Sequence, residues 1–97
     1  MTTNRIPADF DVLGAPVEGF YSELEQYWTI RPQAEWVYHP DRQWLCLGGP
    51  GVDGIEFGVQ KGVAGVFAYY PLEGDCLLKA DSVPELIRGW CEGTITV

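Results

Sequence analysis

The first apolar pattern in the chain predicts a helix that begins at Pro16. Apolar residues follow at spacings of three and four, which place them on one side of a helix. These are Val17, Phe20, Tyr21, Leu24 and Trp28. Proline suits the first turn of a helix, and the pair Arg31-Pro32 disfavours helical backbone at its end. We therefore expect an N-terminal helix here, preceded by a loosely ordered arm over residues 1–15.

From Ala34 onward the apolar period changes from that of a helix to that of strands. Short runs of alternating or continuous apolar residues predict strands at 35–38, 44–47, 55–60, 66–70 and 76–80, with a further short edge segment at 94–97. Segments rich in Gly, Pro and Asp separate the first five runs, and such residues are typical of turns. Because parallel strands need long crossovers, these short connections predict antiparallel neighbours in a meander.

The best-specified element is a helix over residues 82–92. Ser82 and Glu85 have the spacing of a capping box, and Pro84 falls in the first turn. Gly93 suits the left-handed backbone that ends many helices. The chain is therefore expected to be one α+β domain over residues 1–97. An antiparallel meander of about five strands would carry an N-terminal and a C-terminal helix.

Charge narrows the classes of partner. Acidic residues outnumber basic ones 14 to 6, which gives a formal net charge of −8. Such a chain repels phosphate backbones, so we expect no nucleic-acid partner, whereas a basic protein would be attracted. No apolar run reaches the length of a membrane span, and residues 1–10 lack the apolar core of a secretory signal. The three cysteines form no disulfide pattern, which is typical of a reducing compartment, so we expect a cytoplasmic location.

Residues capable of chemistry are few and scattered. His39 is the only histidine and lies in an expected turn, where a solvated side chain is the ordinary interpretation. The glycine-rich loop at 48–54 lacks the lysine and hydroxyl residue of a phosphate-binding loop and leads into a strand. Cys46, Cys76 and Cys91 are widely spaced and are expected to be buried free thiols. We expect no enzyme, no cofactor and no metal site.

Surface aromatic and acidic residues offer a binding hypothesis instead. If helices cover one face of the sheet, aromatic side chains on the other face could form an exposed strip that anchors a partner. The strip would comprise Trp36, Tyr38, Phe57 and Tyr69. Carboxylates of adjacent hairpins could meet at one end of the sheet, namely Asp53, Glu56, Glu73 and Asp75. Solvated loop carboxylates are the plain alternative for this second set.

The second half of the chain resembles the C-terminal half of SUKH-superfamily domains. The similarity lies in a strand that leads into a Gly/Asp turn, a tyrosine-ending strand and a terminal helix of the type A-x-S-x-x-E-L-I-x-x-W. The matching segments are 45–49, 51–54, 66–70 and 80–90. Many bacterial domains of this family are immunity proteins that neutralise toxins, and others are adaptors. The resemblance implies recognition of a protein partner rather than catalysis.

Two alternatives remain open at this point. The chain could be a small-molecule sensor or carrier whose pocket is lined by Trp28, Trp44, Trp90 and tyrosines. It could also be a self-associating module, because an uncovered aromatic face suits a homodimer interface.

Overall fold

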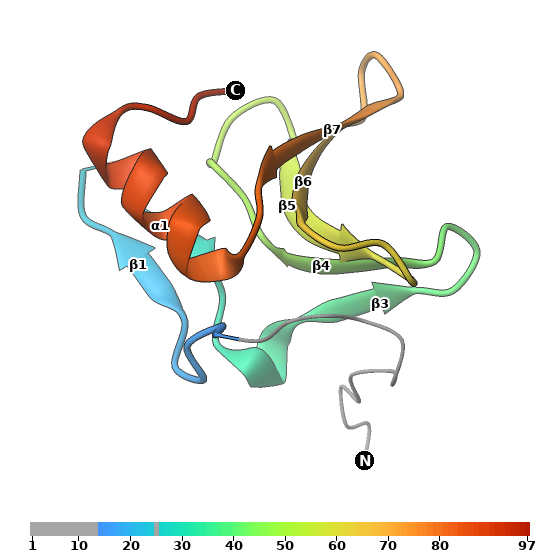
Figure 1. Ribbon diagram of the computed structural model, residues 1–97, viewed down its shortest axis with the longest axis horizontal. Coiled ribbons are helices and arrows are strands. Elements are labelled where there is room, and N and C mark those ends of the chain that lie inside the picture. Colours follow the sequence, from blue (N-terminus) through green and yellow to red (C-terminus); the bar gives the residue numbers. More distant parts are fainter. Residues whose placement is uncertain (1–13, 25) are drawn as a thin grey trace.

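The computed structural model describes residues 14–24 and 26–97, which form two antiparallel sheets and one α-helix (Figure 1). Most of the arm expected at 1–15 lies outside these residues. The smaller sheet is a hairpin of β1 (Phe20–Ser22) and β2 (Tyr27–Ile30), followed by the 3₁₀ turn η1 (Gln33–Glu35). The larger sheet contains β3 (Val37–His39), β4 (Trp44–Gly48), β5 (Glu56–Gln60), β6 (Val66–Tyr70) and β7 (Asp75–Ala80), and α1 (Val83–Glu92) follows it.

The larger sheet is the predicted meander. Its spatial order is β3-β4-β5-β6-β7, and every neighbouring pair is antiparallel. The α+β class, the five strands and the C-terminal helix are thus confirmed. The first predicted strand begins later than expected, because residues 33–35 form a 3₁₀ turn. Residues 94–97 form no strand, so that prediction was wrong.

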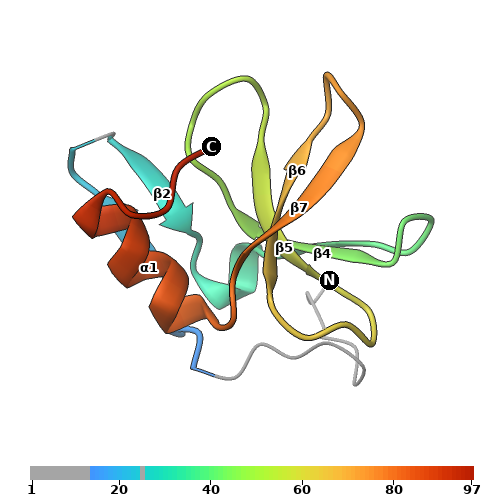
Figure 2. The ribbon, with the colours of Figure 1, turned by 45° about the horizontal axis from the view of Figure 1, so that its top comes forward.

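The hydrophobic core lies between one face of this sheet and α1. Figures 1 and 2 show α1 beside the β1–β2 hairpin, on the same side of the sheet. Phe57 and Val59 of β5 point into this layer, and Val83 and Leu86 of α1 meet them as fully buried side chains. The remaining buried members of the cluster are Ile30, Trp36, Leu45, Leu47, Val66 and Ala68. Alternation along each strand therefore decides which side chains reach the helix.

Helix α1 begins and ends where the sequence predicts. The Ser82 hydroxyl accepts a hydrogen bond from the Glu85 amide at 3.3 Å and donates one to the Glu85 carboxylate at 3.2 Å. Gly93 has a left-handed φ of 77° and its amide donates to the last turn of the helix. The predicted cap is therefore present. The Glu85 carboxylate, however, accepts its hydrogen bond from the Ser82 hydroxyl rather than from a backbone amide.

The predicted N-terminal helix is wrong, because residues 20–30 form a hairpin. Gly19 adopts φ 78°, and a Cβ atom there would lie 2.5 Å from the Ile30 carbonyl oxygen. Gln26 also has a positive φ, of 54°, at the reversal of the hairpin. The apolar stripe expected on one helical face is consequently split. Leu24 is 90% exposed, whereas Phe20 packs against the core.

The hairpin is joined to the larger sheet through β4. The Arg31 amide donates to the Leu47 carbonyl at 2.7 Å, and the Gly49 amide donates to the Trp28 carbonyl at 3.4 Å. The β2 backbone comes so close to Gly48 that a Cβ atom there would collide with the Thr29 carbonyl. One edge of β4 is thus paired with β3 at its start and lies against β2 at its end.

The substitution Gly19→Ala should have opposite effects on stability in a hairpin and in a helix. Gly19→Ala would stabilise a helix, but in the hairpin it adds a methyl group at positive φ against backbone. We expect the free energy of unfolding in urea to fall by about 2 kcal/mol or more. Gly62→Ala is the matched control, because Gly62 has φ 72° and open space around it. It should cost only about 1 kcal/mol. Equal effects, or stabilisation by Gly19→Ala, would contradict the hairpin.

Candidate functional site

An acidic groove at one end of the larger sheet is the strongest candidate site. It has a volume of about 240 Å³ and lies between the glycine-rich loop after β4 and the turn between β6 and β7. Asp53 and Glu73 stand on these two segments and both line the groove. The other lining residues are Val52, Ile55, Tyr70, Pro71, Leu72 and Val97. The groove therefore combines two carboxylates with a mostly apolar lining and contains no basic residue.

The two segments share a local sequence order that sets this chemistry. Each places an apolar residue before an acidic one and ends in glycine, as Val52-Asp53-Gly54 and Leu72-Glu73-Gly74. Gly54 and Gly74 have φ values of 69° and 75°, so each segment reverses through left-handed backbone. The apolar residue of each segment is exposed to solvent. Val52 is 51% exposed and Leu72 is 79% exposed.

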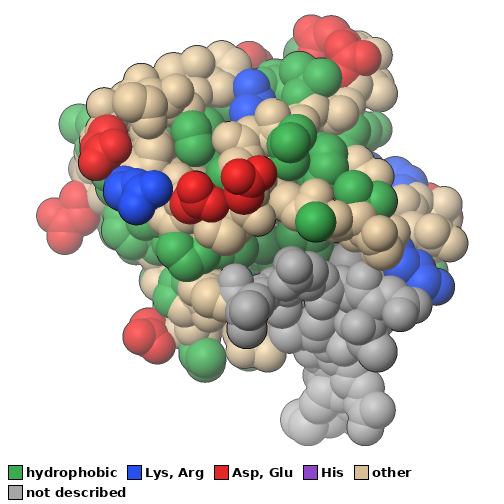
Figure 3. All heavy atoms as spheres, in the orientation of Figure 1, with side chains coloured by type: hydrophobic (Ala, Val, Ile, Leu, Met, Phe, Trp, Pro, Cys, Tyr) green, Lys and Arg blue, Asp and Glu red, His purple; other side chains and the backbone are tan. Residues whose placement is uncertain are grey.

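Backbone hydrogen bonds hold both segments in place. The Ile55 amide donates to the Val52 carbonyl at 3.0 Å, and the Gly74 amide donates to the Tyr70 carbonyl at 2.7 Å. Asp53 itself has φ 55°, a conformation that Asp tolerates better than most residues. Figure 3 shows acidic side chains at the tip of the β6–β7 hairpin, at its upper right. The acidic groove is thus built on two closed turns rather than on loose chain.

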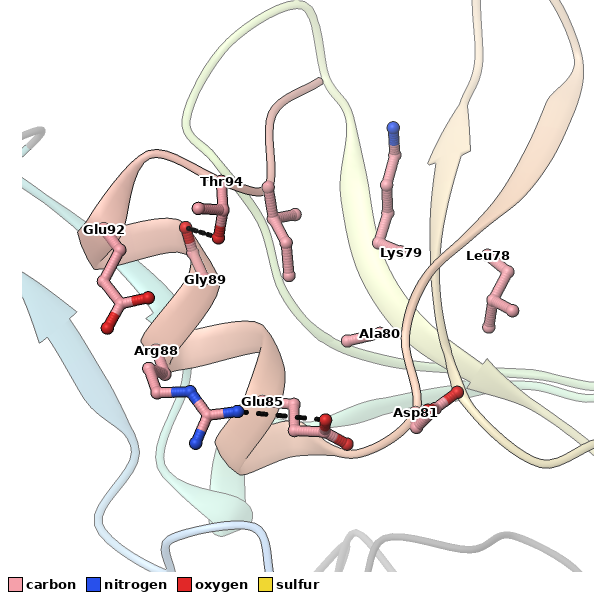
Figure 4. A pocket seen from close by; sticks show the side chains of 10 residues that line it. Leu78, Lys79, Ala80, Asp81, Glu85, Arg88, Gly89, Glu92 and Thr94 are labelled. Carbon is pink, nitrogen blue, oxygen red and sulfur yellow. Dashed lines mark hydrogen bonds and ion pairs between the residues drawn. The ribbon is translucent and has the colours of Figure 1, made fainter.

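Two other cavities differ from the acidic groove in the charge of their linings. The larger, about 390 Å³, lies between β7 and α1 (Figure 4) and mixes Lys79 and Arg88 with three carboxylates. Arg88 and Glu85 form an exposed pair at 3.9 Å, which contributes little. The third, about 210 Å³, lies between the β1–β2 hairpin and α1 and is lined by Leu24 and Trp90 among others. Glu23 is the only charged residue in its lining, so neither cavity brings two carboxylates together without a basic residue.

The exposed aromatic strip predicted from the sequence does not exist. Trp36 is 2% exposed, and its indole donates to the Arg31 carbonyl at 2.8 Å. Phe57 is fully buried and stacks edge to face on Trp90 at 5.6 Å. The half-buried Tyr38 packs against the core, whereas Tyr69 lies on the opposite face of the sheet. The reason is register, since Phe57 pairs with Ala68 and Glu56 pairs with Tyr69.

The four predicted carboxylates are only partly brought together. Asp53 and Glu73 meet in the acidic groove, as expected for adjacent hairpins. Glu56 lies outside it and accepts a hydrogen bond from the Trp44 indole at 2.7 Å, so it supports packing on the far face of the sheet. Asp75 is exposed at the start of β7, opposite Tyr70. The sequence reasoning missed Val52 and Leu72, which the repeated apolar–acidic–glycine order could have indicated.

The pocket expected for a small molecule is not formed by the predicted tryptophans. Trp44 covers Gly58 on the far face of the sheet, where a Cβ atom would lie 2.6 Å from its ring. Trp90 packs on Phe57 in the core. Trp28 lies on the hairpin, 37% exposed, and stacks edge to face with Tyr21 at 5.3 Å. Because the sheet separates Trp44 from Trp90, no single cavity can be lined by both.

The cysteines differ from the expectation of three buried thiols. Cys46 is buried, but Cys76 and Cys91 are exposed. Burial, and to a smaller extent the nearby Glu56 carboxylate, raises the pKa of the Cys46 thiol to about 12. Cys76 receives a hydrogen bond from the Gln60 amide at 3.2 Å. Burial nevertheless raises its pKa, and a raised pKa opposes nucleophilic reactivity.

Metal binding and histidine chemistry gain no geometric support. Between residues 14 and 97, leaving out residue 25, no three His, Cys, Asp or Glu residues are grouped so as to hold a metal ion. His39 is the last residue of β3, opposite Trp44 and half-buried, rather than a fully solvated turn residue. Within the same range, no helix is long and apolar enough to cross a membrane.

Thiol accessibility provides a check on the site geometry. In the native protein, a thiol reagent such as iodoacetamide should modify Cys91 first and Cys76 more slowly, and leave Cys46 unmodified. Because folding raises the pKa of Cys46 from 9.0 to about 12, its contribution to stability is complete below pH 9 and is lost as pH rises toward 12. Mass spectrometry of partly labelled protein measures the order. Early labelling of Cys46 would contradict the described packing of β4.

Comparisons with known proteins add no family to this picture. No family model, no curated protein and no solved structure matches the chain.

Proposed function

We propose that this chain is a non-enzymatic protein-binding domain that recognises a basic partner through the acidic groove. The observation that supports the proposal is the lining of the groove, which combines two carboxylates with exposed apolar side chains and contains no basic residue. A cationic side chain of a partner would meet Asp53 and Glu73, while its apolar part would contact Leu72 and Val52.

Long-range charge supports the same partner chemistry. The net charge of −8 attracts a basic protein and raises the rate of encounter, most strongly at low salt. Short-range affinity must then come from local contacts, because exposed charge pairs alone contribute little. Apolar residues within the groove can supply this second part, since burying apolar surface is favourable and is not screened by salt.

The nature of the partner follows from the resemblance to SUKH domains. On that basis the domain is an immunity protein of the cytoplasm that binds and neutralises a basic toxin. Toxins that act on nucleic acids carry basic surfaces, because they must bind phosphate backbones. If the acidic groove binds such a basic surface, the toxin can no longer bind nucleic acid there.

The experiment uses the product of a toxin-like gene next to the gene for this chain. We expect the purified proteins to bind in calorimetry, and co-expression to protect cells from the toxin. Asp53→Asn together with Glu73→Gln should raise the dissociation constant about tenfold, because both carboxylates meet the partner. Glu18→Gln with Glu92→Gln is the control, since it removes two exposed charges elsewhere. It should change the constant less than about threefold. If both pairs of substitutions weakened binding equally, the partner would be attracted only by the overall negative charge, and the groove would not be its binding site.

The apolar part of the groove predicts a separate effect. Leu72→Ala should weaken binding about tenfold without reducing its salt dependence, because it removes apolar contact and no charge. The free energy of unfolding should change little, as Leu72 is 79% exposed. Val63→Ala, at a 42% exposed position on another turn, is the control and should leave the affinity unchanged. Unchanged binding by Leu72→Ala would mean that the groove does not contact the partner.

A further inference from the structure

Strand β7 is an open edge of the larger sheet. It is the last strand in the spatial order, and β6 is its neighbour. Its residues 75–78 are all exposed, including two adjacent leucines, Leu77 at 48% and Leu78 at 56%. Within the described part of the chain, no strand pairs with its outer edge. An exposed apolar edge of this kind is a template for pairing with another strand.

The side chains of β7 alternate between the two faces. Asp75 and Leu77 lie opposite Tyr70 and Ala68, on the core-facing side of the sheet. Cys76 and Leu78 lie opposite Tyr69 and Phe67, on the far side. Figure 4 shows Leu78 and Lys79 pointing to different sides of the strand.

Lys79 belongs to the same face as Asp75. A register shift leaves Lys79 without a direct partner on β6, but its ammonium group lies over the ring of Tyr70 at 5.6 Å. Tyr70 is in turn the direct neighbour of Asp75 across the sheet. Among the described residues, neither Lys79 nor Asp75 has an ion-pair partner. One face of β7 thus presents an acidic end, a central leucine and a basic end.

We propose that β7 pairs with β7 of a second copy of this chain, antiparallel and centred on Leu77. In this arrangement Asp75 of each copy lies opposite Lys79 of the other, and Leu77 meets its own equivalent on the two-fold axis. On the other face, Cys76 lies opposite Leu78 of the second copy. Cross-strand pairs of opposite charge and apolar pairs are both favourable. The two sheets would join into one continuous sheet.

Symmetry limits the registers to a few. A two-fold axis that relates antiparallel strands stands perpendicular to the sheet, so directly opposed residues must lie on the same face. The centre is therefore a single residue. Centring on Leu78 would place Asp75 opposite Asp81 and Lys79 opposite Leu77. Centring on Cys76 would place Lys79 opposite Glu73 of the turn but would leave Asp75 opposite Leu77. Among these registers, only the one centred on Leu77 pairs Asp75 with a cation.

Two further acidic residues flank this register. Continued beyond the strands, it would bring Glu73 near Asp81 of the second copy. Both lie outside β7, in the turn before it and in the bend that leads into α1. The net charge of −8 on each copy does oppose association. The dimer should therefore be measured near physiological salt, where charges more than about 8 Å apart are largely screened.

Sedimentation velocity over a concentration series tests this pairing. The interface is small, so we expect a reversible dimer with a dissociation constant of roughly 10–100 µM. Asp75→Lys and Lys79→Asp should each weaken it about tenfold or more, because two attractive pairs become repulsive. These variants shift the net charge in opposite directions, so a shared loss is not an effect of overall charge. Circular dichroism should show both variants folded.

Restoration of the charge pairs gives the decisive comparison. An equimolar mixture of the two variants should form a heterodimer, and the double variant Asp75→Lys/Lys79→Asp should recover the homodimer, both within about threefold of the original affinity. Glu18→Lys is the control, because it makes the same charge change as Asp75→Lys at an exposed position outside β7, and it should leave the dimer intact. A monomer at all concentrations would overturn the proposal. So would a dimer that ignores both substitutions, or one in which Glu73→Lys combined with Lys79→Asp restores association instead. None of these outcomes bears on binding at the acidic groove.

Discussion

The close approach of the β2 backbone to β4 at Gly48 is the contact on which the rest of the structure depends. No side chain fits at Gly48, because a Cβ atom would meet the Thr29 carbonyl. The hydrogen bond from the Arg31 amide to the Leu47 carbonyl, 2.7 Å long, forms beside it. At Gly49, a Cβ atom would lie 2.5 Å from the Ile55 carbonyl, so the loop that follows is closed over the strand. These glycines let the small hairpin and the glycine-rich loop settle on the same end of the sheet.

This end of the sheet is where the acidic groove lies. Because the loop closes on Ile55, Asp53 is held next to the turn that carries Glu73. Gly54 touches this turn too, since a Cβ atom there would lie 3.5 Å from Pro71. The core, by contrast, holds the aromatic residues that a surface hypothesis would have placed outside. Phe57 stacks on Trp90, and the Trp36 indole donates a hydrogen bond to the Arg31 carbonyl. The exposed residues at this end of the sheet are instead the carboxylates and apolar side chains of short turns.

Local signals made part of this structure predictable from the sequence. The capping pair Ser82 and Glu85 and the turn residues between strands act within a few residues, so the meander and α1 could be foreseen. The N-terminal hairpin could not, because its apolar spacing also fits a helix and Gly19 reveals its role only against Ile30. The register between neighbouring strands could not be predicted from the sequence either. Whether Phe57 or Glu56 faces the helix depends on pairing with β6, which alternation alone leaves undetermined. The sequence left open whether Asp53 and Glu73 would line one site or stay separate in solvent, and it did not indicate the apolar lining around them.

The central claim is that the acidic groove, rather than the overall negative charge, recognises a basic ligand. The most direct measurement is a titration of the ¹⁵N-labelled protein with a short lysine- and leucine-containing peptide, followed by amide chemical shifts. We expect the largest changes in the lining of the groove, at Val52, Asp53, Leu72 and Glu73. Equal changes around other exposed carboxylates, such as Glu18 and Glu92, would contradict it, as would a spectrum that does not change.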